Sequence, residues 1–176
     1  MPVYHSQHNS SSAPIICGAA LLPLRTKFNG PAPAPPMGSE EPFEDIVDEA
    51  LKSFRWNIFF KNFEVQGSAD KVLVYITLWI QKCLLTASQS SGMQDAKNQL
   101  ERLATADIAV PGSPNFILAP FFTDPKNPQE ANCFKDYSKQ LRQETLARLL
   151  PMLYPNGTPN KWWFQFCKKK FMNVAL

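Results

Sequence analysis

The segment at residues 69–85, ADKVLVYITLWIQKCLL, decides the fold of this chain. Coiled as a helix it is apolar around almost its whole circumference, although its β-branched residues would also suit a buried strand. Its length favours a helix, because strands seldom exceed about ten residues. A helix that is apolar on every side belongs at the centre of a fold, with other elements around it.

Proline marks where further helices can lie, because it breaks helices. Eight of the 16 prolines fall within residues 1–43, five between 111 and 128, and three between 151 and 159. The proline-poor ranges between these groups are long enough for several helices. With 176 residues, 44% of them hydrophobic, the chain can form one domain with a substantial core.

A first helix is expected over residues 43–60. Its apolar residues repeat at spacings of three and four and form one stripe: Ile46, Val47, Ala50, Leu51, Phe54 and Ile58. Four carboxylates crowd its first turns: Glu44, Asp45, Asp48 and Glu49. Clustered acids can indicate catalysis or metal binding, but no companion ligands are evident. Their position opposite the positive end of the helix dipole favours a structural role.

The remaining helices are expected to begin at capping residues. Ser68 is a candidate cap for the central helix, and a weaker amphipathic helix should follow over residues 93–106, with Leu100 and Leu103 inward. The apolar connection at residues 111–122, PGSPNFILAPFF, must pack on the domain.

A long helix should start after the cap Asn127, with Pro128 in its first turn, and end near Leu150 before Pro151. Its inward residues are expected to be Phe134, Tyr137, Leu141 and Leu149. Thr158 and Pro159 repeat the start pattern and predict a tail helix.

Residues 1–42 are expected to form an extended proline-rich arm on a helical domain of residues 43–176, one domain overall. A disordered linker is the alternative. The arm, however, contains ALLPLRTKF at residues 20–28, which is too apolar for a solvated tether. We expect it to lie over the domain or a partner, with residues 37–41 as its flexible part.

The tail at residues 161–176, KWWFQFCKKKFMNVAL, combines aromatic residues with lysines. Helical spacing places Trp163, Cys167, Phe171 and Val174 on one face, which is typical of a core stripe. Three consecutive lysines on a helix point in directions about 100° apart, so they do not form the basic face of a membrane-surface helix. The nine residues after Cys167 exclude prenylation. Stacking on single-stranded nucleic acid remains an alternative to a packed C-terminal helix with lysines on its rim.

Patterns typical of enzymes are absent from the sequence. No glycine-rich phosphate loop or nucleophile elbow occurs, and no two of the four cysteines have zinc-type spacing. The only histidines, His5 and His8, lie in the arm. We therefore expect no catalytic residues, no metal and no cofactor. Scattered thiols and the lack of a signal peptide favour a cytosolic all-α protein, and its longest apolar run, residues 72–80, is about half a membrane span.

Several blocks resemble, in order, the 21-kDa subunit family (subunit 3) of the actin-related protein 2/3 complex. They are a Tyr-His-Ser triplet at residues 4–6, ALLPLRTKFNGPAP, DIVDEA, FFKNFE, ADKVLVYITL, PGSPNF, QLRQET, and the closing KWW…F…K…FMN…L. The resemblance runs from Pro2 to Leu176. Residues 30–44 look expanded relative to the family, and residues 115–122 replace a more Gly/Pro-rich stretch.

The resemblance implies an all-α fold in which one helix is wrapped by the others. It also implies a non-catalytic subunit of a seven-protein cytoplasmic assembly that nucleates branched actin filaments in the actin cytoskeleton. The expected partners are the other six subunits, chiefly the larger actin-related subunit, and the actin filament. Neither nucleic acid nor a membrane is expected as a partner.

Two sets of residues are candidates for partner binding. Arm residues Leu24, Arg25, Lys27 and Phe28 would dock the chain in the complex. Residues Lys168, Lys169 and Lys170 would attract the acidic surface of actin. The alternative for each set is that the arm only covers the domain's own core and the lysines are only solvated. The alternative function is a small adaptor that binds nucleic acid or another acidic ligand through an aromatic-basic C-terminal helix.

Overall fold

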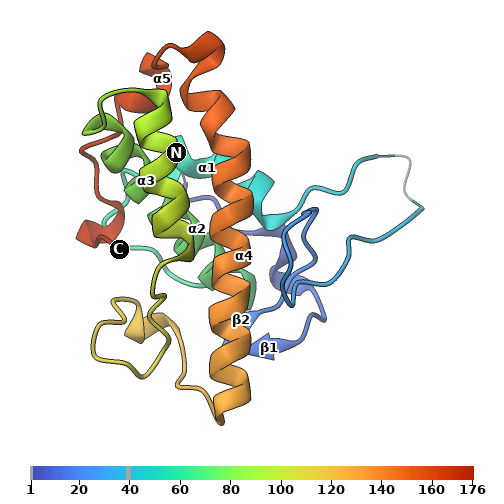
Figure 1. The fold of residues 1–176 in the computed structure, drawn as a ribbon. Coiled ribbons are helices and arrows are strands. Elements are labelled where there is room, and N and C mark those ends of the chain that lie inside the picture. Colours follow the sequence, from blue (N-terminus) through green and yellow to red (C-terminus); the bar gives the residue numbers. More distant parts are fainter. Residues whose placement is uncertain (1, 39–40) are drawn as a thin grey trace.

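Helix α2 (Ser68–Ser88) occupies the centre of the molecule in the computed structural model, which describes residues 2–38 and 41–176 (Figure 1). Fifteen of its 21 residues are buried. Helices α1 (Ile46–Asn57), α3 (Met93–Thr105) and α4 (Pro128–Leu153) all pack against it. The prediction of an all-α fold wrapped around this segment is therefore confirmed, apart from one very short hairpin.

Helix α1 begins three residues later than the sequence predicted because Asp45 caps it. The Asp45 Oδ1 accepts from the Asp48 backbone N at 3.0 Å, and Asp48 Oδ2 accepts from the Asp45 backbone N at 3.1 Å. This reciprocal pair is a capping box. The predicted apolar stripe of α1 is buried throughout.

The predicted cap of α2 is wrong. Ser68 is the first helical residue, and the capping position belongs to Gly67, which has no side chain to offer. That role falls to the arm, because Asn9 Oδ1 accepts from the backbone N of Asp70, the third helical residue, at 2.9 Å.

The connection between α3 and α4 packs on the domain as predicted. It contains one short 3-10 helix, η2 (Ala119–Phe121). The rings of Phe116 and Phe122 meet the ring of Phe134 edge to face, with centroids 5.9 and 5.6 Å apart. In α3 itself, Leu100 is buried and Leu103 is half-buried.

Helix α4 starts as predicted but does not end at Pro151. The Asn127 side chain accepts from the backbone N of Glu130 at 2.8 Å, with Pro128 next in the chain. Pro151 lies inside the last turn, where its missing N–H removes a single bond, and the backbone N of Tyr154 still donates to Leu150 O at 3.1 Å.

The arm is built into the core of the domain. It contains the 3-10 helix η1 (Gln7–Ser10) and strands β1 (Ile15–Ile16) and β2 (Ala19–Ala20), which pair antiparallel with Ile15 opposite Ala20. Leu22 and Leu24 belong to the same buried cluster as the helices. The loop after Pro31 then projects from the body (Figure 1). Residues 39 and 40, in the range predicted to be flexible, lie outside the described residues.

The predicted continuous tail helix is wrong. Helix α5 (Lys161–Phe164) has one turn and is capped by Asn160, not by Thr158. A short 3-10 helix, η3 (Pro155–Gly157), precedes it, and η4 (Phe171–Asn173) follows. The predicted core contact survives without the helix, because Phe171 is buried and Trp163, Cys167 and Val174 pack partly buried against the core.

Candidate partner-binding surfaces

The polar residues of the domain hold the N-terminal arm in place. Within residues 2–38 and 41–176 no group of three or more His, Cys, Asp or Glu side chains is placed to hold a metal ion. No helix in this described part is both long and apolar enough to cross a membrane. The two histidines hold the arm: His5 Nδ1 lies 2.7 Å from Asp70 Oδ2, and His8 Nε2 lies 2.9 Å from Glu44 O.

Two buried carboxylates fasten the N-terminal segment. Glu49 of α1, 2% exposed, accepts from Tyr4 Oη and Ser6 Oγ, each at 2.6 Å, and from Gln7 N at 2.8 Å. Asp70 of α2 accepts from Ser6 N at 2.7 Å. Burial, and after it the hydrogen bond to Glu49, raise the pKa of Tyr4 above its ordinary value, so this phenol stays a donor. Glu49 of α1 therefore has a structural role in binding the arm, whereas the sequence predicted only an interaction of these acids with the helix dipole.

Arg148 of α4 joins the arm, α1 and α4. Its guanidinium donates to both carboxylate oxygens of Asp45 at 2.7 Å, to Asp48 Oδ1 at 2.9 Å and to Arg25 O at 2.7 Å. Burial alone would raise the pKa of the Asp45 carboxyl. The hydrogen bond and charge of Arg148, together with the backbone hydrogen bonds from Asp48 and Arg25, outweigh burial and hold that pKa below its usual range.

The four predicted arm residues divide between core and surface. Leu24 is only 2% exposed and packs in the chain's own core, so it presents no side chain to a partner. Arg25, Lys27 and Phe28 are exposed. The Arg25 side chain already pairs with Asp48, which leaves Lys27 and Phe28 as the more available of the three.

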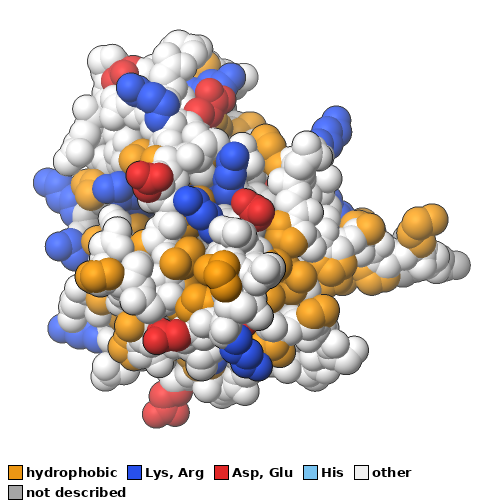
Figure 2. Space-filling model, turned by 60° about the horizontal axis from the view of Figure 1, so that its bottom comes forward, with side chains coloured by type: hydrophobic (Ala, Val, Ile, Leu, Met, Phe, Trp, Pro, Cys, Tyr) orange, Lys and Arg blue, Asp and Glu red, His pale blue; other side chains and the backbone are white. Residues whose placement is uncertain are grey.

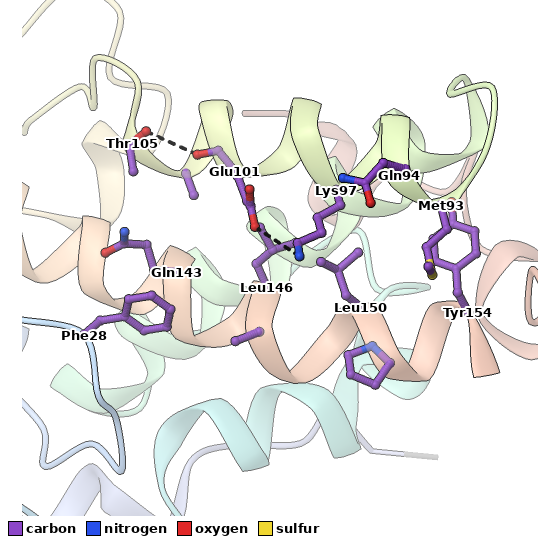
Figure 3. Close-up of a pocket in the computed structure, with 13 residues that line it drawn as sticks. Phe28, Met93, Gln94, Lys97, Glu101, Thr105, Gln143, Leu146, Leu150 and Tyr154 are labelled. Carbon is purple, nitrogen blue, oxygen red and sulfur yellow. Dashed lines mark hydrogen bonds and ion pairs between the residues drawn. The ribbon is translucent and has the colours of Figure 1, made fainter. Parts of the chain in front are cut away.

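Phe28 stands at one end of a groove between α3 and α4 (Figure 3). This α3–α4 groove has a volume of about 690 Å³. Figure 3 shows Leu146 and Leu150 of α4 along its length, and Met93 and Tyr154 at the end opposite Phe28. Sequence reasoning missed the groove because the two leucines, spaced by four, look like ordinary core positions of an amphipathic helix.

The spread of directions predicted for the three tail lysines does not apply, because the chain around them is not helical. They follow α5 outside any helix, and all three line one recess of about 100 Å³ together with Lys82 of α2. In Figure 2, basic side chains follow the left edge of the molecule, the side on which the C-terminus lies in Figure 1.

The tail aromatics face mostly inward. Trp163 stacks on Phe54 with ring centroids 5.8 Å apart, and Phe166 meets the same ring edge to face at 6.1 Å. Trp162, by contrast, is 79% exposed. Trp162 is the one exposed tryptophan of the tail, and one ring is no stacking platform for successive bases, so the geometry weighs against the nucleic-acid alternative.

Comparison with known proteins decides the family. All of residues 1–176 match the sequence model of the family described as ARP2/3 complex ARPC3 (21 kDa) subunit. The chain belongs to the ARPC3 family. The resemblance inferred from the sequence blocks is thereby confirmed.

Relatives from distant organisms share the full length of this ARPC3-family chain. "Actin-related protein 2/3 complex subunit 3" of Schizosaccharomyces pombe is 43% identical, with all of both chains covered. The proteins of the same name from Arabidopsis thaliana and Saccharomyces cerevisiae are 42% and 37% identical, over 99% and 100% of both chains. These relatives are named as subunits of a complex, and they give no support to a nucleic-acid adaptor.

Proposed function

We propose that this ARPC3-family chain is a non-catalytic subunit of the ARP2/3 complex in the cytoplasm and actin cytoskeleton. There it helps to assemble the complex, which nucleates branched actin filaments, and contacts the mother filament. The observation that carries the proposal is the family match over every residue of the chain. Co-purification from lysate tests it: actin-related proteins should dominate the eluate. A free monomer, or an eluate that depends on nucleic acid, would overturn it.

Assembly is proposed to use Arg25, Lys27 and Phe28, with the larger actin-related subunit as the chief neighbour among the other six. The α3–α4 groove supports this assignment, because it places an apolar hollow directly beside Phe28. Exposed apolar hollows rimmed by polar residues are typical of protein–protein contacts.

Phe28→Ala combined with Lys27→Glu tests the assembly contact. Both side chains are exposed, so the fold should persist while recovery of the other subunits on the immobilised chain falls, on the order of tenfold for loss of an aromatic contact. Met37→Ala is a matched control, since Met37 is 98% exposed and lies outside the groove. Equal recovery with the double variant and the control would contradict the assignment.

Contact with the filament is proposed to use Lys168, Lys169 and Lys170. Support comes from their exposure and from the lack of an ion pair to any of them among the described residues. Changing all three to Glu should reduce the number of branches per filament length while the complex still assembles. The loss should be largest at low ionic strength, because surface charges are screened by salt. Branching that is unchanged across ionic strength would remove this part of the proposal.

A further inference from the structure

The loop that projects from the body carries a short apolar segment, Ala-Pro-Pro-Met at residues 34–37, which we call the Pro-Pro segment. Ala34, Pro36 and Met37 are exposed, and Pro35 is half-buried. Figure 1 shows the loop standing away from the helices, and Figure 2 shows hydrophobic side chains along it. Met37 is 98% exposed, so this long apolar side chain buries almost no surface and adds nothing to the stability of the fold.

Helix α4 holds the base of this loop in place. The Gln140 side chain is 2% exposed, donates to Phe28 O and accepts from Ala32 N, each at 3.0 Å. The backbone N of Leu24 donates to Pro33 O at 3.1 Å. The chain is thus anchored directly before the Pro-Pro segment, and the anchor directs that segment away from the core.

The local sequence restricts this part of the loop to an extended backbone of the polyproline II kind. Every residue from 30 to 36, GPAPAPP, is a proline or directly precedes one. Proline fixes its own φ at about −65°, and the residue before a proline is driven out of the helical region. Gly38 ends the stretch in a left-handed turn, with φ +97°. Four residues at about 3.1 Å each make the Pro-Pro segment a ridge about 12 Å long.

The ridge is open to a partner on its backbone as well as on its side chains. Residues 34–38 form no helix or strand. Within residues 2–38 and 41–176, no hydrogen bond joins residues 34–38 to another part of the chain. A partner that binds this segment therefore displaces no contact of the domain.

We propose that the Pro-Pro segment is a ligand for a protein domain whose groove is lined by aromatic rings and binds polyproline II chains. The rings of Pro35 and Pro36 stack in that groove, and Met37 supplies an apolar contact at its end. The segment is already extended and its base is fixed, so little conformational entropy is lost on binding. The inference goes beyond the proposed function, because the proposed assembly contact uses residues 25, 27 and 28 and leaves the Pro-Pro segment free.

The chemistry of the segment favours this partner over a second copy of the chain or a membrane. Strand pairing with a second copy needs backbone N–H groups, and Pro35 and Pro36 have none. Membrane surfaces attract basic residues and long amphipathic helices, but residues 30–38 contain no charged side chain and the loop has no helix. Recognition therefore rests on the proline rings and the neighbouring methionine.

Binding of the full chain to immobilised SH3, WW and EVH1 domains, which have such grooves, tests the proposal. At least one of these domains should bind the chain saturably, and a synthetic peptide of residues 30–38 should compete. Pro35→Ala with Pro36→Ala should weaken this binding about tenfold, because both rings that enter the groove are lost. The matched control is Pro155→Ala with Pro159→Ala, which changes two exposed prolines outside the loop and should leave binding unchanged. Thermal unfolding of each variant shows whether the fold is retained.

Three results would overturn the proposal. One is the lack of saturable binding to every domain of the three classes. Another is binding of the Pro35 and Pro36 variant that is as tight as that of the unchanged chain, and the third is equal weakening by the control pair. The assay contains no other subunit, so its outcome is independent of the co-purification that tests the proposed function.

Discussion

At the scale of single residues, buried charges and their partners fasten segments that are distant in the sequence. Glu49 and Asp70 hold Tyr4, His5, Ser6 and Gln7 of the arm through hydrogen bonds of 2.6 to 2.8 Å. Each carboxylate has several donors, which is the condition under which a buried charge is tolerated. Glu49 and Asp70 lie in the first turns of α1 and α2, where their charge favours the start of the helix. The same two carboxylates also fix the position of the arm.

Arg148→Met should destabilise the protein strongly at neutral pH. The change leaves the buried carboxylate of Asp45 without its guanidinium, and removing one partner of a buried pair costs about 3–5 kcal/mol. Urea unfolding measures the free energy. Arg102→Met, on the exposed face of α3, is the control and should change it by less than about 0.5 kcal/mol. Similar decreases in unfolding free energy for both variants would show that Arg148 does not stabilise the contact between the arm, α1 and α4.

The pH dependence of stability should follow from the lowered pKa of Asp45. A carboxyl whose pKa is lower in the folded state contributes stability above its unfolded pKa, about 3.9, and loses it as pH falls through the folded value. In Arg148→Met the pKa of Asp45 loses the lowering contribution of the guanidinium, and only the backbone hydrogen bonds from Asp48 and Arg25 still oppose burial. The difference in unfolding free energy between the two proteins should therefore shrink as pH falls from about 5 to about 2, where Asp45 becomes protonated in the folded wild-type protein. A difference that is constant or grows over this range would contradict the assignment.

At the scale of elements, tertiary contacts decide where helices end. Pro151 fails to stop α4 because the last turn loses a single hydrogen bond there. The tail, in contrast, stops being α-helical after one turn and continues in tighter turns, with Phe166 N donating to Trp163 O and Cys167 N to Phe164 O. Further on, Gln81 of α2 binds the backbone groups of Phe171 and Val174. The apolar residues of the tail are thus packed against the core although their spacing is helical and the chain that carries them is irregular. Helix α2 holds this chain in place.

Gln81→Leu should loosen the tail while α2 stays intact. Leucine is similar in size to glutamine, is not branched at Cβ and suits a helix. It leaves the backbone N–H of the buried residue Phe171 without its acceptor, however, which costs about 1–3 kcal/mol. Hydrogen exchange at the Phe171 amide should accelerate, with amides in the middle of α2 unaffected. Gln94→Leu on the exposed surface of α3 serves as the control. Unchanged exchange at Phe171 would show that Gln81 is not what holds the tail.

At the scale of the whole molecule, the arm and the helices share one core. Cys17, Ala19, Ala20, Leu22 and Leu24 are buried with residues of all the long helices. Beyond this anchored part, Figure 2 shows hydrophobic side chains extending onto the loop that projects from the body. The chain thus anchors residues 2–24 to the helices through buried side chains and hydrogen bonds, so this segment cannot serve as a detachable tether to a partner.

Removal of residues 1–24 should abolish cooperative folding. Losing the burial of Leu22 and Leu24 alone costs about 2–3 kcal/mol each, and Glu49 and Asp70 would be left without donors. These losses approach the total stability of a typical domain, about 5–15 kcal/mol. Thermal unfolding followed by circular dichroism should lose its sharp transition, whereas Met37→Ser in the projecting loop should retain it. A truncated chain with a sharp transition near that of the full chain would disprove this account.

The sequence by itself determined the parts of this protein that depend on local pattern. The apolar segment 69–85 fixed the central helix, because no other position can bury a helix on every side. The α1 stripe, the Asn127 cap and the family blocks could also be predicted from the sequence, since recognising each of them requires only residue type and spacing. Tertiary structure alone decided that Leu24 is core and that the non-helical tail lies against α2. Both features depend on contacts between segments that are distant in the sequence. Hydrogen bonds such as those from Arg148 to Asp45 and from Phe171 to Gln81 leave no periodic pattern along the chain.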